Sequence, residues 1–382
     1  MKILIPCIID LYKSAPNRPH HLIKYLSKDH DITAICINDW WKGEQVNSDI
    51  YFENFRESLD SITIHYITNK KISPIKQELF ASKLINLDIL DEEYDVIFNY
   101  NTLNSGRHLA KKLDIPMIYD IADDLPEMIA HSPQIPSFFR PFGRWYGRYL
   151  LDRNIQLAKK ITATSPVFKE LYSISDDKFE LIPNGVDTDL FRKMDSTIRK
   201  ELGLEKSFVL GYVGVLREWI DFTPVLEAMK ELPDTKLLIV GEEGRLNATK
   251  NLVHQMGLDE RVVFTGTVPY MKVPEYIAAM DVCLLPFKKN AISDNAVPLK
   301  LFEYLACEKP VISPKLKSIQ ILFKNELFYA DNSMEFEENL KKLINNENNV
   351  SKEIFQGNFI ENNYNWKRIC NKIEIVINDF QS

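Results

Sequence analysis

Short apolar runs of strand length recur along this chain, and segments long enough for a helix separate them. In the first half they cover residues 3–9, 32–37, 62–67, 96–100, 116–120 and 161–164, and in the second half 208–213, 236–240, 262–265, 282–286 and 310–313. Near-continuous apolar strands that alternate with helices are typical of parallel sheets covered on both faces. Two such sets predict an α/β chain with two Rossmann-like, doubly wound domains.

The boundary between the two sets is marked by Pro-Asn-Gly at 183–185, a strong turn signal. A length of 382 residues also favours two domains, at about 150 residues each. We therefore predict domains over residues 1–180 and 181–360. In residues 361–382, apolar positions recur at helical spacing from Trp366 to Phe380, which predicts a terminal amphipathic helix with one buried face.

The composition is that of a globular protein, with 45% hydrophobic and 26% charged residues. The formal net charge of −7 argues against general affinity for nucleic acid, which needs clustered positive charge. The five cysteines form no CxxC pair, so we expect buried thiols in a reducing compartment, neither disulfides nor zinc ligands. We interpret the apolar start as a first strand and not as a signal peptide. No run of about 18 apolar residues is present, and we predict a cytoplasmic protein.

In open α/β sheets, ligands bind beyond the carboxyl ends of the strands, so the loops that follow the strands hold the candidate site residues. In the second half, Gly214 allows close approach of the backbone to a ligand, and the guanidinium of Arg217 matches phosphate oxygens. Gly241 and Glu243 follow the next strand and can form a wall of the same pocket. The alternatives are a plain turn with a solvated Arg and a turn with surface carboxylates.

The loop after the third strand of this half ends in Val268, Pro269 and Tyr270. Its backbone groups can contact the edge of a nucleotide base, and Tyr270 can stack on a ligand or pack inside. The alternative is a loop that leads into a helix near Lys272.

The stretch from Asp294 to Leu299 enters a predicted helix over 299–307. Backbone N–H groups at a helix start favour a phosphate group. The helix dipole disfavours Lys300 in the first turn, and a bound anion would explain that lysine. Glu303 lies one turn on, on the same face, where a carboxylate can accept both hydroxyls of a ribose. The alternative is a surface Glu–Lys pair.

In the first half, Asp120, Asp123 and Asp124 stand at the end of one strand. One of these carboxylates can orient or deprotonate a hydroxyl group. Helix N-capping is the alternative. After the first strand, Arg18, His20 or His21 can contact a ligand, or can simply be first-turn residues of a helix.

Aromatic and Arg residues interleave from 138 to 153. One interpretation is docking on an anionic lipid surface or binding of a lipid diphosphate. The other is a helix that packs its aromatic side chains inside and leaves its Arg side chains solvated.

An ordered series of motifs in the second half resembles the retaining glycosyltransferases of the two-Rossmann GT-B fold, family 4 (group 1). The series comprises Pro-Asn-Gly-Val-Asp at 183–187, the glycine turn at Gly214, Leu-Leu-Ile-Val-Gly at 237–241, Val-Phe-Thr-Gly-Thr-Val-Pro at 263–269, residues 278–286, and 300–312 beginning Lys-Leu-Phe-Glu-Tyr. The first half matches more loosely, through Arg-Pro-His-His-Leu at 18–22 and Tyr-Asp-x-x-Asp-Asp at 119–124. These runs look like a subgroup that also has the Pro-Leu-Lys-Leu-Phe-Glu-Tyr motif.

The resemblance implies an N-terminal acceptor domain and a C-terminal donor domain that face across a cleft, with the C-terminal helix packing back toward the first domain. It implies transfer of a hexosyl group from a UDP-, GDP- or dTDP-sugar to a glycan or lipid-linked acceptor in polysaccharide or glycoconjugate assembly. The anomeric configuration would be retained, with no metal and no other cofactor. Positive groups and a helix start would stabilise the leaving diphosphate.

Residue roles follow from the same resemblance. The expected donor-binding residues are Gly214, Arg217, Gly241, Glu243, Val268, Tyr270, Asn295, Leu299, Lys300 and Glu303. The expected catalytic residues are Asp123, Arg217 and Lys300, and the expected acceptor contacts are Arg18, His20, Asp120 and Asp124. Glu303 matches the second Glu of the family's paired-Glu motif, which holds the ribose.

Three positions depart from the family pattern. Asn295 stands where the first Glu of the pair is usual, and that Glu contacts the donor sugar. Trp219 stands where a Lys is common, and we expect Lys300 to substitute for it. A His that is common after the fifth strand would fall near Ala122, which leaves Asp123 as the candidate.

Two other functions stay open on the sequence. One is a nucleotide-sugar epimerase or hydrolase of the same fold, which acts without an acceptor. The other is a catalytically inactive GT-B scaffold that binds a partner. Residues 138–153 also leave open a peripheral contact with the inner face of the membrane.

Overall fold

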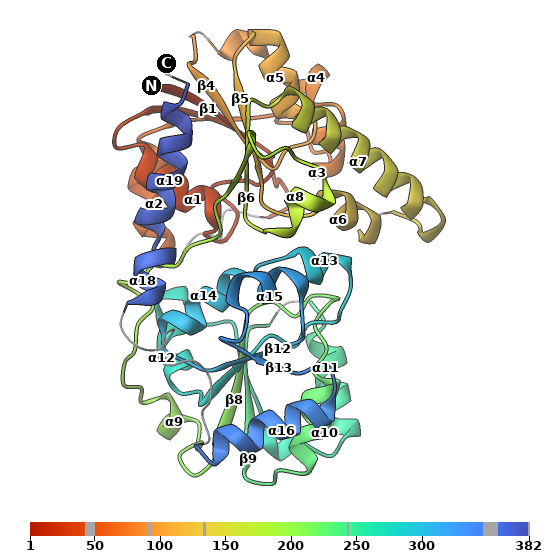
Figure 1. The fold of residues 1–382 in the computed structure, drawn as a ribbon, viewed down its shortest axis with the longest axis vertical. Helices are drawn as coiled ribbons and strands as arrows, with labels where there is room; N and C mark the ends of the chain where they lie inside the picture. The colour runs from red at the N-terminus through yellow and green to blue at the C-terminus, as the bar shows by residue number, and fades with distance from the viewer. Residues whose placement is uncertain (43–49, 91–92, 133–134, 243, 347–357, 381–382) are drawn as a thin grey trace. The chain divides into compact units, whose positions relative to one another are not determined.

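The computed structural model describes residues 1–42, 50–90, 93–132, 135–242, 244–346 and 358–380. The chain divides into two compact units. Unit 1 comprises Met1–Pro183 together with Trp366–Ser382, and unit 2 comprises Asn184–Asn365. Each unit is a parallel sheet with helices on its faces (Figure 1).

The sheet of unit 1 has the order β3-β2-β1-β4-β5-β6-β7, and every pair is parallel. Its strands are β1 (Lys2–Cys7), β2 (Asp31–Cys36), β3 (Thr63–Tyr66), β4 (Val96–Tyr100), β5 (Met117–Ile121), β6 (Lys160–Ala163) and β7 (Phe179–Leu181). Both β4 and β5 are buried at all five positions, because helices cover the two faces of the sheet.

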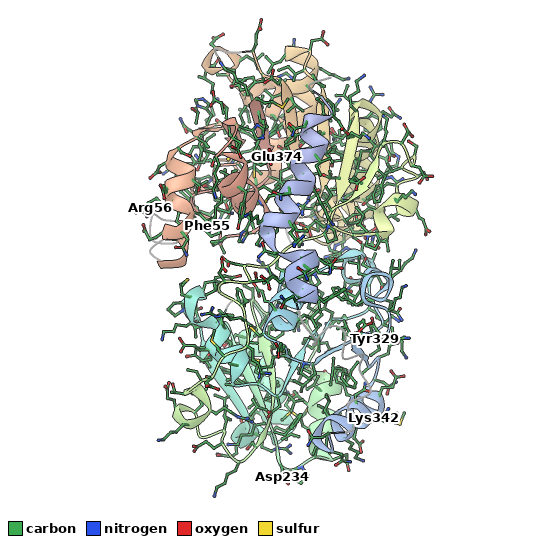
Figure 2. The ribbon with its side chains drawn as sticks, turned by 60° about the vertical axis from the view of Figure 1, so that its left-hand side comes forward. Phe55, Arg56, Asp234, Tyr329, Lys342 and Glu374 are labelled. Carbon is green, nitrogen blue, oxygen red and sulfur yellow. The ribbon has the colours of Figure 1, made fainter. Side chains whose placement is uncertain are left out.

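The helices of unit 1 fill the connections between these strands. They are α1 (Arg18–Leu26), α2 (Ile50–Asp60), α3 (Pro74–Leu79), α4 (Ala81–Leu84), α5 (Ser105–Leu113), α6 (Leu125–His131), α7 (Arg140–Leu157) and α8 (Val167–Leu171), with short 3-10 turns η2 (Leu87–Ile89) and η3 (Ser137–Phe139). Phe55 of α2, which is labelled in Figure 2, packs edge-on against the His21 ring of α1; the ring centroids are 4.9 Å apart.

The predicted terminal helix is α19 (Trp366–Asn378), and it belongs to unit 1. Trp366, Ile369 and Ile373 are buried on one face, whereas Ile375 is 65% exposed. The Trp366 ring stacks on His21 of α1, with centroids 4.4 Å apart. The predicted amphipathic pattern is therefore confirmed, and its apolar face covers α1.

The sheet of unit 2 has the order β10-β9-β8-β11-β12-β13, again with every pair parallel. Its strands are β8 (Phe208–Val213), β9 (Thr235–Val240), β10 (Val262–Gly266), β11 (Val282–Leu284), β12 (Val311–Ser313) and β13 (Phe328–Tyr329). Both sheets confirm the predicted pair of Rossmann-like domains.

The helices of unit 2 surround this second sheet. They are α9 (Ile198–Glu201), α10 (Thr223–Lys230), α11 (Leu246–Gln255), α12 (Val273–Ala278), α13 (Ala291–Asn295), α14 (Leu299–Ala306), α15 (Lys317–Phe323), α16 (Ser333–Ile344) and α18 (Phe359–Tyr364), with 3-10 turns η4 (Asp259–Arg261) and η5 (Tyr270–Lys272). The Asn339 side chain of α16 donates a hydrogen bond to the Tyr329 carbonyl at 2.8 Å and so ties this helix to edge strand β13. Tyr329 of β13 and Lys342 of α16 are labelled in Figure 2.

Each sheet has one edge strand that the apolar runs did not predict. β7 has three residues and β13 has two, and neither is buried along its whole length. Edge strands this short carry too few apolar residues to form a recognisable run. All five cysteines are buried and unpaired. Among the helices in the described ranges, none is long and apolar enough to cross a bilayer.

Candidate active site

Two glycines shape the carboxyl edge of the unit 2 sheet. Gly214 follows β8 with φ +128°, and Gly241 follows β9 with φ +133°. A Cβ at Gly241 would lie 2.4 Å from the Gly214 carbonyl oxygen, and a Cβ at Gly214 would lie 2.5 Å from Lys300 Nζ. Gly241 therefore needs glycine because a backbone carbonyl crowds it, and both positions favour glycine because their φ angles are positive.

Lys300 reaches back from the first turn of α14 to the end of β8. Its Nζ donates to the Tyr212 hydroxyl at 2.8 Å and lies 4.0 Å from the centre of the Tyr212 ring. The Tyr212 hydroxyl in turn donates to the Val215 carbonyl at 2.9 Å. Tyr212 thus holds the ammonium group over the Gly214 turn.

The charge on Lys300 is only weakly compensated. Burial lowers its pKa to about 7, against the charge of Glu303, and Arg217 lowers it further. Arg217 is exposed and follows the same glycine turn. Two cationic groups near a helix start repel each other, and a bound anion would stabilise the charged form of both.

Glu303 lies one turn along α14 and is 8% exposed. Burial raises its pKa, against a hydrogen bond from the Tyr270 hydroxyl and the charge of Lys300. Tyr270 comes from η5, after β10, and its ring packs edge-on against Phe191 at 5.4 Å. The carboxylate is therefore fixed from a second strand end.

Tyr304 secures the start of α14 to the sheet. Its hydroxyl accepts a hydrogen bond from the Val213 backbone N–H at 2.8 Å, and its side chain is fully buried. Tyr212 and Tyr304 are the two site residues whose roles the sequence did not predict. Where a strand or helix is buried on several sides, its pattern of apolar and polar residues does not indicate which tyrosine faces the site.

The remaining donor-site residues lie around this group. Leu299 is the first residue of α14 and is half-buried, as is Val268 after β10. Asn295 ends α13, a helix that Asn290 caps by accepting from the Ser293 backbone N–H at 3.1 Å. Glu243 lies outside the described residues. The donor roles predicted for these residues stay predictions.

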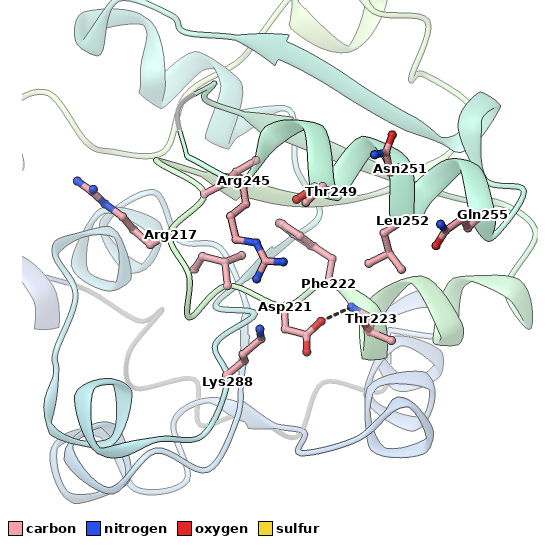
Figure 3. A pocket seen from close by; sticks show the side chains of 13 residues that line it. Arg217, Asp221, Phe222, Thr223, Arg245, Thr249, Asn251, Leu252, Gln255 and Lys288 are labelled. Atoms are coloured by element: carbon pink, nitrogen blue, oxygen red, sulfur yellow. Dashed lines mark hydrogen bonds between the residues drawn. The ribbon is translucent and has the colours of Figure 1, made fainter. Parts of the chain in front are cut away.

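A cavity of about 460 Å³ lies between the loop after β8 and α11. Arg245 and Lys288 extend into this cavity, whereas Arg217 points away from it (Figure 3). Lys300 and Glu303 are not part of its lining. Arg217 borders this cavity, and its charge also acts on Lys300.

In unit 1, Arg18 and Asp120 are buried against each other. Arg18 Nε and Nη2 donate to the two Asp120 oxygens at 2.8 and 2.9 Å, and the side chains are 2% and 0% exposed. Thr162 donates to Asp120 at 2.6 Å, and Arg18 Nη1 donates to the Pro183 carbonyl at 3.0 Å. These hydrogen bonds connect β5, β6 and α1 to one another and to Pro183, where the first segment of unit 1 ends.

His20 and His21 are first-turn residues of α1, one of the two interpretations offered by the sequence. His20 contacts the Leu11 carbonyl at 2.8 Å and the Asn17 side chain at 3.1 Å. Burial lowers its pKa to about 4, so the ring is neutral. Burial also lowers the pKa of His21, which stacks on Trp366.

The acidic run after β5 separates into different environments. Asp124 caps α6, with its carboxylate accepting from the Glu127 backbone N–H at 3.1 Å. The Asp123 side chain is exposed. Partial desolvation by the surrounding loop, followed by the carboxylates of Asp124 and Asp120, raises the pKa of Asp123 to about 6. Among the described residues, no three His, Cys, Asp or Glu side chains gather in a way that would hold a metal ion.

Two parallel Rossmann-like units, with a glycine turn, lysine and glutamate at the strand ends of the second, define a GT-B type of protein. Comparison with known families agrees. Residues 194–366 match the family described as Glycosyl transferases group 1, and residues 17–190 match Glycosyltransferase Family 4. The chain therefore belongs to the GT4-type glycosyltransferases of the GT-B fold.

Individual relatives are more distant. A Bacillus subtilis protein named as a teichuronic acid biosynthesis glycosyltransferase, TuaH, is 30% identical over 207 residues, which are 53% of this chain and 51% of that protein. The chain thus spans about half the length of this curated relative. Sucrose-phosphate synthase from Thermosynechococcus elongatus superimposes with a TM-score of 0.77, at 14% identity, over 99% of this chain and 98% of that one. Anabaena HepE in complex with UDP-glucose gives 0.72, at 20% identity, over 99% and 100%.

Proposed function

We propose that this protein transfers a sugar from a nucleotide-sugar donor to an acceptor in polysaccharide or glycoconjugate assembly, with retention of configuration and without a metal. The observation that carries the proposal is the half-buried Lys300 in the first turn of α14, held over the Gly214 turn beside Glu303. A lysine whose pKa is about 7 in the free protein is stabilised when an anion binds beside it.

The donor diphosphate lies against the start of α14, where Lys300 and Arg217 meet it and backbone N–H groups point toward it. Glu303 accepts the ribose hydroxyls, and Tyr270 keeps that carboxylate oriented. The base lies along the loop near Val268. Asn295 faces the donor sugar, at the position where the family usually has a Glu.

In the reaction, the bond between the anomeric carbon and the phosphate oxygen breaks and negative charge grows on the diphosphate. Lys300 and Arg217 stabilise that charge in place of a metal ion. The acceptor hydroxyl oxygen bonds to the anomeric carbon on the face that the phosphate leaves. Asp123, with a pKa of about 6, orients this hydroxyl and takes its proton.

Arg18, His20, Asp120 and Asp124 were predicted to contact the acceptor. Arg18 and Asp120 form an ion pair with each other. His20 and Asp124 make hydrogen bonds at the starts of α1 and α6. Within this proposal they shape the acceptor region by holding β5, α1 and α6 in place. Buried unpaired cysteines are in keeping with a cytoplasmic location.

A nucleotide and sugar-nucleotide panel tests the proposal. Purified protein is titrated with UDP, GDP and dTDP by calorimetry, and the matching sugar nucleotides are then assayed for transfer and slow hydrolysis. UDP-glucose is the first candidate, since HepE is known in complex with it. Folded protein that binds none of the panel would contradict the proposal.

Asp123→Asn separates donor binding from transfer. Nucleotide affinity should stay at the wild-type value, because Asp123 lies in unit 1 and the donor residues in unit 2. Transfer should fall by about 100-fold, the size of a lost general base. Wild-type activity should rise as the pH passes 6, since the carboxylate must be deprotonated to accept a proton. The anomeric configuration of the product, read by NMR, tests retention.

A further inference from the structure

Helix α7 exposes a row of large aromatic side chains. Phe142, Trp145 and Tyr149 recur at three- and four-residue spacing and are 60%, 61% and 46% exposed. Phe138, just before the helix, is 74% exposed. Contiguous exposed aromatic residues of this size mark an interaction surface. The sequence offered an alternative in which these rings pack inside, and the exposures contradict it for these four.

The opposite side of α7 explains why the rings face outward. A Cβ at Gly147 would lie 3.1 Å from Pro126 Cα of α6, so this glycine lets the two helices pack closely. Leu150 and Leu151 are buried on the same side. The helix is therefore fixed to unit 1 by one face and turns its aromatic face away, and Figure 1 shows its first turns extending beyond the sheet.

The charge on this helix is opposite to that of the whole chain. Residues 137–154 contain four Arg and one Asp, a net charge of +3, whereas the chain carries −7. Arg144 and Arg148 pair with Glu127 and Asp152. Arg140 and Arg153 are exposed, and the Arg153 guanidinium lies 5.8 Å from the centre of the Tyr149 ring. Arg beside exposed Trp and Tyr is the composition of a surface that rests on anionic lipid headgroups.

An apolar cavity of about 480 Å³ opens beside the same helix. Its walls come from the strand-end loops and α3, through residues such as Ile8, Ile37, Ile75 and Leu103. Glu78 also lines it, but the Glu78 carboxylate accepts from the backbone N–H of Asn104 at 2.9 Å and from the Ser105 hydroxyl. That carboxylate is satisfied by the start of α5, so the cavity offers mainly apolar surface to a ligand.

Two residues join the cavity to the exposed surface. Phe139 and Phe142 line the cavity and are also 53% and 60% exposed. A chain that leaves the cavity therefore passes directly onto the aromatic face of α7. The cavity also lies at the carboxyl ends of β1, β2 and β4, the edge where α/β sheets bind ligands.

We propose that unit 1 binds a lipid-linked acceptor whose hydrocarbon chain occupies this cavity, while the aromatic and Arg side chains of α7 rest on an anionic bilayer. This inference rests on the proposed glycosyl transfer and names the class of its acceptor. The head group of such a lipid carries the hydroxyl that receives the sugar and an anionic phosphate that the Arg side chains of α7 attract.

Vesicle flotation with the full chain tests the membrane contact. Wild-type protein should float with phosphatidylcholine vesicles that contain phosphatidylglycerol, and should stay behind with pure phosphatidylcholine. Phe138→Ser with Trp145→Ser should lower the bound fraction about tenfold, because these side chains insert at the interface. Ile375→Ser removes an equally exposed apolar side chain from α19 and should bind like the wild type.

Two outcomes would overturn the membrane contact. One is equal flotation of the double variant and the wild type. The other is a wild-type dimer by light scattering that the double variant converts to a monomer, since a second copy would then cover α7. Circular dichroism of the double variant must match the wild type, and Trp145→Phe, which keeps an apolar ring, should retain flotation.

Calorimetry with short lipid phosphates tests the cavity. Farnesyl phosphate and dodecyl phosphate, kept below their micelle concentrations, distinguish an isoprenoid from an unbranched chain, and at least one should bind. Leu79 lines the cavity and is 41% exposed, so Leu79→Trp fills the cavity without crowding the core. This variant should lose at least about tenfold in affinity for the lipid phosphate, and unchanged affinity or no wild-type binding would contradict the proposal.

The lipid measurements do not depend on the donor site. If the proposed glycosyl transfer is wrong, nucleotide binding fails while lipid binding persists. If the lipid proposal alone is wrong, UDP binding and the Lys300 dependence of that binding persist without flotation or lipid affinity.

Discussion

The carboxyl ends of the two sheets carry charged side chains in both units, but the charges are used differently. In unit 2, Lys300 is half-buried with a pKa lowered to about 7, and its partner is a neutral tyrosine hydroxyl. In unit 1, Arg18 and Asp120 neutralise each other in a buried bidentate pair. At this edge, unit 2 thus presents an incompletely compensated cation, whereas the buried cation of unit 1 is fully paired with Asp120.

This difference indicates what each edge can bind. A cation that burial destabilises gains from an anionic ligand, as the proposed diphosphate would provide. In unit 1 the Arg18–Asp120 pair leaves no buried charge for a ligand, and the cavity beside α7 offers mainly apolar walls. Four experiments, from the largest expected effect to the smallest, can break or refine this comparison.

Arg18→Ala should destabilise the protein most, by about 3–5 kcal/mol, because it leaves Asp120 buried without its partner. Urea unfolding followed by circular dichroism measures this loss. Arg18→Met combined with Asp120→Leu should cost less than the single change, since no charge stays uncompensated. A stable Arg18→Ala protein with a raised KM for the acceptor would instead show that Arg18 contacts the acceptor.

Lys300→Met should weaken binding of the nucleoside diphosphate by about 1.5–3 kcal/mol, the value of a hydrogen bond to a charged group, or roughly ten- to hundredfold. Calorimetric titration measures the change. Lys341→Met, on the exposed face of α16, serves as the matched control and should bind normally. Equal affinity of the two variants would remove Lys300 from the donor site.

The pH dependence of nucleotide binding follows from the pKa of about 7 for Lys300 in the free protein. A bound diphosphate favours the charged form and raises this pKa, so binding takes up a proton above pH 7. Affinity should therefore fall as the pH rises from 7 to 8.5, by up to about tenfold per pH unit. Lys300→Met should abolish this slope, and a slope that persists in the variant belongs to another group.

Glu303→Gln should have the smallest effect, about 0.5–1.5 kcal/mol, because an amide still accepts one hydrogen bond from the ribose. The informative readout is the ratio of affinities for UDP and 2′-deoxy-UDP, which should move toward one. Tyr270→Phe, which removes only the hydroxyl that orients Glu303, should shift the ratio less. An unchanged ratio in Glu303→Gln would place the ribose elsewhere.

Much of the fold was predictable because buried parallel strands appear in the sequence as apolar runs. Strands β4 and β8 have the predicted bounds, and most others differ by one or two residues at their ends. The edge strands β7 and β13 were missed because strands of two or three residues are too short to form an apolar run. The helix pattern from Trp366 onward predicted α19 and its buried face.

The candidate site was predictable in part. Gly214, Lys300 and Glu303 were expected at strand and helix ends, and the structure brings the three together. The burial of Arg18, His20 and Asp120 was not predictable, since a polar residue after a strand can face either a ligand or another side chain of the protein. Tyr212 gave no signal, because a tyrosine in a buried strand has the same spacing whether it fills the core or holds a lysine.

The sequence alone determined the two Rossmann-like sheets, the turn between them and the residue types at their carboxyl edges, because periodicity and turn chemistry are local properties. The tertiary structure decided which of those residues are paired. Lys300 depends on Tyr212, 88 positions away, and Arg18 depends on Asp120, 102 positions away. Burial and pairing of charges are set by such distant contacts, and they decide whether a charged group is available to a ligand or already satisfied by the protein.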